Sequence, residues 1–147
     1  MRIFLDANLY ISYLLKPDSP SAACEIVRRA FAREFEILIC EPLFAELKRV
    51  KRESSYLGPR ISEEALAILI MRLEMIGRVV NIVDTNKSWG IRDKNDQYIL
   101  DTADQGHADV IVSGDGHLLK DRANWPELRI LAASEFLPIW IEANTAQ

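Results

Sequence analysis

The sequence predicts an α/β protein, a three-layer α/β/α sandwich around a mostly parallel sheet of four to five strands. Short runs of apolar residues recur along the chain, and segments with helical spacing of apolar residues separate them. Runs that are apolar at every position are typical of strands buried on both faces, as in a parallel sheet. The 147 residues, 49% of them apolar, are enough for one sizeable core. We expect one domain over residues 1–142 and a frayed tail over residues 143–147.

Five apolar runs are the expected strands, at residues 3–5, 36–40, 79–83, 109–113 and 129–131. Helical spacing predicts helices over residues 9–15, 22–34, 41–52, 63–77, 96–105 and 117–122, and an amphipathic segment after Ser134. Asn8 is the expected N-cap of the first helix, and Pro42 stands at the tolerated first position of the third. Polar segments with glycine predict loops over residues 54–60 and 85–95.

Composition and charge limit the classes of function. The net charge of −4 excludes a uniformly basic nucleic-acid binder, so such binding requires a local patch or a metal. Cys24 and Cys40 belong to no Cys-x-x-Cys motif and are expected to be buried, reduced thiols. No apolar run is long enough to span a bilayer, and Asp6 interrupts the N-terminal apolar stretch that a signal peptide needs. We therefore expect a cytoplasmic protein with no membrane partner.

Two acids follow expected strands directly. Asp6 ends the first apolar run, and Asp115 follows the fourth after Ser113 and Gly114. The carboxyl ends of parallel strands lie at one edge of a sheet, where open α/β sheets bind their ligands. Each acid also has an ordinary interpretation as a turn residue.

Two further acids lie on helices where acids are costly. Glu46 lies on or beside an apolar stripe, and Asp96 occupies the first position of the apolar face of its helix. Glu46 has an alternative role as an ion-pair partner of Lys48 or Arg49, and Asp96 as a first-turn acid. Asp101 is about 140° around the helix from Asp96 and should face solvent.

Buried carboxylates that converge on one crevice repel one another unless a cation joins them. Mg²⁺ or Mn²⁺ prefers oxygen ligands and stabilises charge on a phosphoryl oxygen, which points to phosphodiester chemistry. His107 and His117 lack the spacing of zinc ligands.

With these residues identified, the chain resembles PIN-domain proteins, in particular the VapC-like ribonucleases of toxin–antitoxin systems. The resemblance runs from Arg2 to about Leu137. It rests on residues 4–12 (FLDANLYIS), the helix around Glu46, residues 92–100 (RDKNDQYIL) and residues 108–119 (ADVIVSGDGHLL).

The resemblance implies a metal-dependent endoribonuclease with a PIN-like fold. It places the four metal-binding, catalytic acids on Asp6, Glu46, Asp96 and Asp115, with Mg²⁺ or Mn²⁺ as the cofactor. It assigns supporting polar roles to Asn8 and Ser113. This chain departs from the family pattern at Ala7, at Lys94-Asn95 and at Ala132-Ala133, and the second departure makes Asp93 a rival of Asp96.

An acidic site needs flanking cations to accept RNA. The candidates are Lys48, Arg49, Lys51, Arg52, Arg60, Arg92 and Lys94. The resemblance also implies a small antitoxin protein as partner and allows a homodimer.

Two other functions remain open. A catalytically inert PIN-like module would bind RNA or a protein through exposed apolar residues on the helices between residues 44 and 73. An aspartyl phosphatase would use Asp6 as nucleophile, but that chemistry usually needs a second Asp two positions later, where this chain has Asn8.

Overall fold

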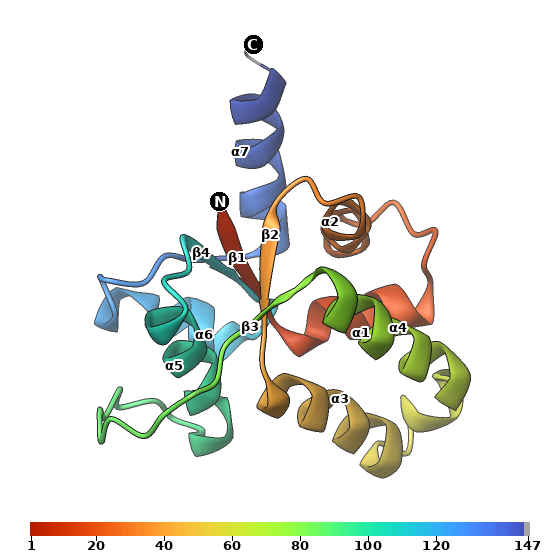
Figure 1. Cartoon of the computed structure of the whole chain (residues 1–147), viewed down its shortest axis with the longest axis horizontal. Coiled ribbons are helices and arrows are strands. Elements are labelled where there is room, and N and C mark those ends of the chain that lie inside the picture. The colour runs from red at the N-terminus through yellow and green to blue at the C-terminus, as the bar shows by residue number, and fades with distance from the viewer. Residues whose placement is uncertain (146–147) are drawn as a thin grey trace.

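All five strands of the sheet run parallel, in the order β3-β2-β1-β4-β5 (Figure 1). The computed structural model describes residues 1–145. The strands are β1 (Arg2–Leu5), β2 (Glu36–Ile39), β3 (Arg78–Val79), β4 (Val110–Val112) and β5 (Ile130–Leu131). The three-layer α/β/α class predicted from the sequence is confirmed.

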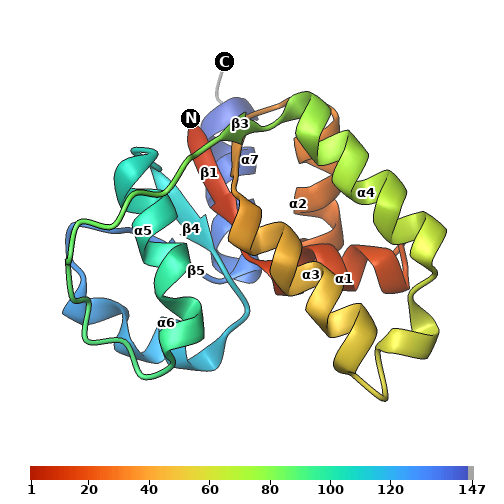
Figure 2. The ribbon, with the colours of Figure 1, turned by 60° about the horizontal axis from the view of Figure 1, so that its bottom comes forward.

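Seven helices cover the sheet. They are α1 (Ala7–Leu15), α2 (Ala22–Phe31), α3 (Glu41–Glu53), α4 (Glu63–Ile76), α5 (Gln97–Gln105), α6 (Gly116–Asp121) and α7 (Ala133–Thr145) among residues 1–145. Three short 3₁₀ turns accompany them, η1 (Gly58–Arg60), η2 (Lys94–Asp96) and η3 (Arg122–Asn124). Helices α1, α2 and α4 lie on one side of the sheet, and α5 and α6 lie on the other (Figure 2).

Strand β1 is the centre of the sheet and of the core. Ile3 pairs with Ile37 on one side and with Val110 on the other, and Ile3, Phe4 and Leu5 are completely buried. The chain leaves β1 toward β2 on one side, and β4 is added later on the opposite side of β1. The carboxyl end of β1 is therefore the point where the strand order reverses, which is where open α/β sheets form their ligand crevice.

The third strand is shorter than the predicted run over residues 79–83. Only Arg78 and Val79 pair with β2, because β2 ends at Ile39 and the chain turns there into α3. Val83 instead bonds through both backbone groups to the side-chain amide of Gln105, at 2.9 and 2.8 Å. Apolar side chains beyond Val79 therefore belong to a connection that crosses toward α5.

Three predicted helix boundaries also change. Helix α1 begins at Ala7 with Asp6 as N-cap, so the prediction that Asn8 caps a helix from Leu9 was wrong. Helix α5 begins at Gln97, because Asp96 still belongs to the preceding 3₁₀ turn. Helix α7 begins before Ser134 and continues to Thr145, beyond the predicted domain end at residue 142. The rest of the predicted frayed tail, residues 146–147, lies outside the described residues.

Other sequence-based expectations concern exposure. Cys24 and Cys40 are buried free thiols, as predicted. Across the described part of the chain, no helix combines the length and apolar character needed to cross a membrane.

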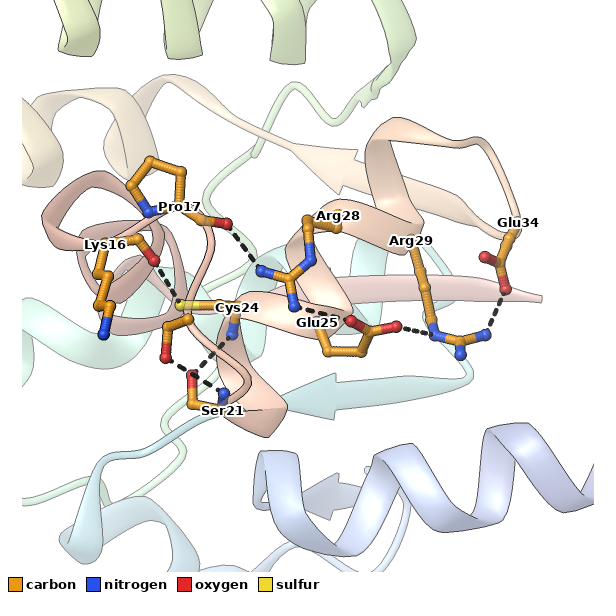
Figure 3. A network of polar contacts seen from close by, with 9 residues as sticks. Lys16, Pro17, Ser21, Cys24, Glu25, Arg28, Arg29 and Glu34 are labelled. Carbon is orange, nitrogen blue, oxygen red and sulfur yellow. Dashed lines mark hydrogen bonds and ion pairs between the residues drawn. The ribbon is translucent and has the colours of Figure 1, made fainter.

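Cations pair with acids along helix α2 (Figure 3). The Glu25 carboxylate accepts hydrogen bonds from Arg28 and Arg29 at 2.8 and 3.0 Å, and Arg29 also reaches Glu34 at 2.9 Å. The hydrogen bond from Arg28, followed by the other contacts of this network, holds the pKa of Glu25 below its usual value despite partial desolvation. These acids are neutralised by neighbours, which contrasts with Asp6 and Asp96 at the carboxyl edge of the sheet.

Candidate functional site

Asp6 lies at the carboxyl end of β1 and is 6% exposed. Its Oδ1 atom accepts a 2.7 Å hydrogen bond from the backbone N–H of Ala7, which caps α1. Its Oδ2 atom accepts a 2.6 Å hydrogen bond from Ser113 and a longer one, 3.4 Å, from Asn8. The carboxylate is thus held in one orientation at the point where the strand order reverses.

Asn8 and Ser113 join the ends of β1 and β4. Asn8 Oδ1 accepts a 3.1 Å hydrogen bond from the backbone N–H of Gly114, while its amide group faces Asp6. Ser113 is fully buried, and its hydroxyl oxygen accepts a 3.0 Å hydrogen bond from the N–H of Asp115. Both residues therefore contact the first acid and the loop that carries the fourth.

The environment of Asp6 disfavours its charged form. Burial raises the pKa of Asp6 above its usual value, and the hydrogen bonds from Ser113 and Ala7 only partly oppose this effect. The negative charges of Asp115 and Glu46 raise the pKa of Asp6 further. A buried carboxylate near other carboxylates and without a cationic partner is a costly arrangement that is typical of functional sites.

Asp96 shares this environment from the start of α5. Its pKa is raised to about 7, first by burial and then by the charges of Asp115, Asp93, Asp6 and Glu46. Asp93 is exposed, and its carboxylate accepts a 2.9 Å hydrogen bond from Asn95 N–H as a cap. The negative charges of Asp6, Glu46 and Asp115 thus act on Asp96, whereas Asp93 caps the local turn. This arrangement favours Asp96 over Asp93 as the third acid of the site.

The other two acids have local partners. Glu46 on α3 forms a two-pronged ion pair with Arg49, with contacts of 2.7 and 3.1 Å, so the alternative pairing considered from the sequence is present. Asp115 is half-buried and caps α6 by accepting a 2.8 Å hydrogen bond from His117 N–H. Both acids raise the pKa of Asp6, so their charges reach the centre of the site.

The seven candidate RNA-binding cations are divided among several surfaces. Lys48, Lys51 and Arg52 line a groove of about 580 Å³ between α3 and α4. Arg60 lies over the ring of Tyr56 at 3.8 Å, in the connection between the same two helices. Of the α3 cations, only Arg49 shares a hollow with Glu46. The cations of α3 therefore line two separate hollows and do not form one continuous surface.

Of the two candidate cations outside α3 and its connection to α4, Arg92 forms a two-pronged ion pair with Asp121, at 2.7 and 2.9 Å. Lys94 lines a separate hollow beside Gln97 and Tyr98. Asp101, which was expected to face solvent, is half-buried and accepts a 2.8 Å hydrogen bond from the indole of Trp89. That prediction was wrong because residues 80–95 fold back over α5.

Sequence reasoning missed Tyr98. Its phenol is half-buried, and burial together with the charges of Asp6, Cys40, Glu46 and Asp96 raises its pKa. The sequence does show an aromatic residue two positions after the candidate ligand Asp96. Helical spacing alone, however, does not indicate that this residue lies at the site.

The donor set fits a hard divalent cation in its chemistry, because it consists of carboxylates that repel one another. Within residues 1–145, no three acidic, histidine or cysteine side chains already stand together as a group that could hold a metal ion. Glu46 is directed to Arg49 and Asp115 to the α6 backbone. Binding would therefore require these two side chains to turn toward Asp6.

The fold and site define an α/β/α protein with several acids at the carboxyl edge of a parallel sheet. The family model described as the PIN domain matches residues 2–117, and the chain belongs to the PIN domain family. The resemblance inferred from the sequence is thereby confirmed.

A solved structure supports the same fold. The crystal structure of VapBC2 from Rickettsia felis, bound to a DNA fragment from their promoter, is similar to this chain with a TM-score of 0.62. The alignment covers 90% of this chain and 98% of that chain at 17% sequence identity. A comparison with curated protein sequences found no significant match.

Proposed function

We propose that this protein is a metal-dependent endoribonuclease that hydrolyses RNA phosphodiester bonds. The observation that carries the proposal is the buried Asp6 carboxylate, whose charge is disfavoured by burial and by other acids of the same edge. A nearby cation would offset this cost and favour the charged carboxylate. Membership of the PIN domain family supports the same reading.

Asp6, Glu46, Asp96 and Asp115 would hold one or two Mg²⁺ or Mn²⁺ ions. When bound, the cation supplies an activated water and stabilises the charge that develops on phosphoryl and leaving oxygens. Ser113 and Asn8 fix the orientation of Asp6, as groups behind metal ligands commonly do. Asp96, with a pKa of about 7, has to release its proton before it becomes a ligand.

We further propose that the protein is the toxin of a toxin–antitoxin pair and acts in the cytoplasm. The similar structure of VapBC2 supports this assignment. On α4, Ile68, Met71 and Met75 are exposed to 44, 55 and 70%, a surface suited to a protein partner. An antitoxin protein or a second copy of this chain would cover such a surface.

Cleavage of labelled single-stranded RNA tests the enzymatic proposal. The wild-type chain should cut RNA with Mg²⁺ or Mn²⁺ and stop when EDTA is added. Asp6→Asn should abolish this activity and leave the fold intact, because the amide is nearly isosteric and removes a disfavoured buried charge. Asp104→Asn is the matched control, since Asp104 lies at the other end of α5 and contacts exposed Lys87 at 3.7 Å. Asp6→Asn cutting as fast as wild type would refute the mechanism.

The inert binding module is the second candidate. The Glu46–Arg49 ion pair favours it, because it occupies an acid that the metal site needs. RNA binding or partner binding by a wild-type chain that cuts nothing with either cation would establish this alternative.

A further inference from the structure

Two hollows lie on either side of one aromatic residue. The first hollow, of about 300 Å³, is lined by Pro42, Ala45, Glu46, Arg49, Asn95 and Tyr98. The second hollow, of about 540 Å³, shares Pro42 and Tyr98 with the first and adds residues that include Val83, Asp84 and Lys94. Pro42 and Tyr98 are therefore the boundary between the two hollows.

The core holds the ring of Tyr98 in place. The Tyr98 ring packs edge-on against Phe4 of β1, with ring centroids 6.3 Å apart and an interplanar angle of 79°. Phe4 is completely buried, while Tyr98 is half-buried and retains surface in both hollows. A ring that the core holds in place and that still lines two hollows is suited to stacking, because little side-chain entropy is lost when a base binds.

One cation lines each hollow, beside the shared residues Pro42 and Tyr98. Arg49 lines the first hollow and Lys94 the second. The two acids of the second hollow are engaged with neighbours: Asp84 accepts a 2.8 Å hydrogen bond from Asn86 N–H, and Asp101 accepts one of 2.8 Å from the Trp89 indole. Glu46 of the first hollow belongs to the proposed metal site. The hollows thus offer an aromatic ring, flanking positive charge and, in the first hollow, one acid of the proposed metal site.

We propose that the two hollows are adjacent nucleotide subsites for single-stranded RNA and that Tyr98 is a specificity-determining residue on which one base stacks. This inference rests on the proposed ribonuclease function, because it assigns positions to nucleotides beside the scissile phosphate. Single-stranded RNA offers unstacked bases to aromatic side chains, whereas the bases of a duplex are already stacked. The positive charges of Arg49 and Lys94 suit phosphates on either side of the stacked base.

Binding is measured in the Asp6→Asn background, so that the RNA is not cut. Fluorescence anisotropy with the four labelled RNA homopolymers gives the affinity of single-stranded RNA, and a hairpin RNA and the matching DNA strands serve as comparisons. Adding Tyr98→Leu should weaken binding of the preferred homopolymer by about 5- to 100-fold, the range typical for loss of one stacked base. Adding Tyr98→Phe should retain the affinity because the ring remains.

Tyr13→Leu is the matched control, since Tyr13 is likewise half-buried, packs edge-to-face with Phe31 at a centroid distance of 5.4 Å, and lines neither hollow. It should leave the affinity unchanged. Because Tyr98→Leu removes a packing partner of Phe4, a second measurement is independent of folding. Photo-crosslinking of a 4-thiouridine RNA to the Asp6→Asn protein, mapped by mass spectrometry, should yield an adduct at Tyr98.

The outcomes separate this inference from the proposed function. If the wild-type chain cuts RNA but Tyr98→Leu binds as tightly as its parent, or crosslinks map only elsewhere, the subsites are refuted and the ribonuclease stands. If no cutting occurs but binding depends on Tyr98, the subsites stand and the enzymatic proposal fails. Failure of all four homopolymers to bind, or equal binding of the hairpin, overturns the inference.

Discussion

The hydroxyl of Ser113 lies 2.6 Å from Oδ2 of Asp6, although the two residues are 107 positions apart in the sequence. The pairing of Leu5 with Val112 brings them together, because each residue directly follows one of these paired strand ends. The fold therefore delivers a hydrogen-bond donor to a buried carboxylate at the centre of the sheet.

Ser113→Ala should destabilise the protein and shift its pH dependence. Removing the donor leaves a buried acceptor with one long contact to Asn8, at a cost of about 1–3 kcal/mol in the free energy of unfolding. The Ser113 hydrogen bond lowers the pKa of Asp6, so its loss raises that pKa further. The acid limb of the cleavage rate should then move to higher pH, which urea denaturation and a pH–rate profile measure.

Ser12→Ala is the matched control for this change. The Ser12 hydroxyl donates to the backbone carbonyl of Asn8 at 3.0 Å, one helical turn from the site, and contacts no acid of the site. We expect a change within about 0.5 kcal/mol and no shift of the pH profile. Identical behaviour of the two alanine variants would contradict the role assigned to Ser113.

Asp96→Asn should stabilise the metal-free protein at neutral pH. The pKa of Asp96 is about 7 in the fold against an unperturbed value of 3.8. As the pH rises from about 4 to 7, the unfolded chain releases this proton while the folded chain keeps it, so the wild type loses stability across that window. The Asp96→Asn variant has no titrating group at this position, so it does not lose stability in this way as the pH rises.

Thermal unfolding in EDTA measures the difference. We expect equal Tm values at pH 4 and a Tm of Asp96→Asn that is higher by about 2–4 °C at pH 8, since water screens part of the penalty at a half-buried group. Mn²⁺ should raise the Tm of the wild type and have a smaller effect on the variant. A variant that is less stable at pH 8 without metal would show that the charge is not disfavoured.

Much of this site follows from sequence because strand ends are easy to recognise. The apolar runs before Asp6 and Asp115 predict buried strands, and a parallel sheet places both acids at one edge. Asp96 and Glu46 are detectable because an acid on an apolar helix stripe is costly. The strand order brings the elements that carry these acids to one edge of the sheet, but the directions of the Glu46 and Asp115 side chains depend on their local partners.

The remaining features depend on packing that a local pattern does not encode. Helix geometry points Lys48 and Arg49 in different directions, about 100° apart, but only the position of α4 makes the surface beside Lys48 a separate groove. The end of β3 at Val79 depends on where β2 turns into α3, and not on the apolar character of residues 80–83. Tyr98 was missed because the hollows beside it form only where helix α3 and the connection at residues 82–84 come close to it.

Arg49→Gln should strengthen metal binding by the protein alone. The Arg49 guanidinium holds Glu46 by contacts of 2.7 and 3.1 Å and competes with a cation for the same carboxylate. Releasing Glu46 should lower the Kd of Mn²⁺ several-fold in calorimetric titration. The same change should raise the KM for RNA, because the first hollow loses its positive charge.

Arg52→Gln is the control, since Arg52 contacts Glu53 at 3.7 Å on the exposed surface and lines the groove between α3 and α4. It should leave the Kd of Mn²⁺ unchanged. Weaker Mn²⁺ binding by Arg49→Gln would mean that Arg49 positions Glu46 for the metal and does not compete with it.

Gly58→Ala should destabilise the connection between α3 and α4, whereas Gly116→Ala should not. A methyl group at Gly58 would lie 2.5 Å from the backbone oxygen of Lys51, and backbone atoms cannot move away cheaply. We expect a loss of about 1–3 kcal/mol, as for other overpacked sites.

Gly116 is the matched glycine because no atom lies within 4 Å of the added methyl group and the residue begins α6. Alanine there should leave stability unchanged or raise it by up to about 1 kcal/mol by restricting the unfolded chain. Urea denaturation with equal m-values measures both variants. Glu46 lies in the first half of α3 and Gly58 beyond its last residue, so folded Gly58→Ala should still bind Mn²⁺ with wild-type affinity. A weakened affinity would show that the α3–α4 connection also controls the position of Glu46, and would extend the site to that end of the helix.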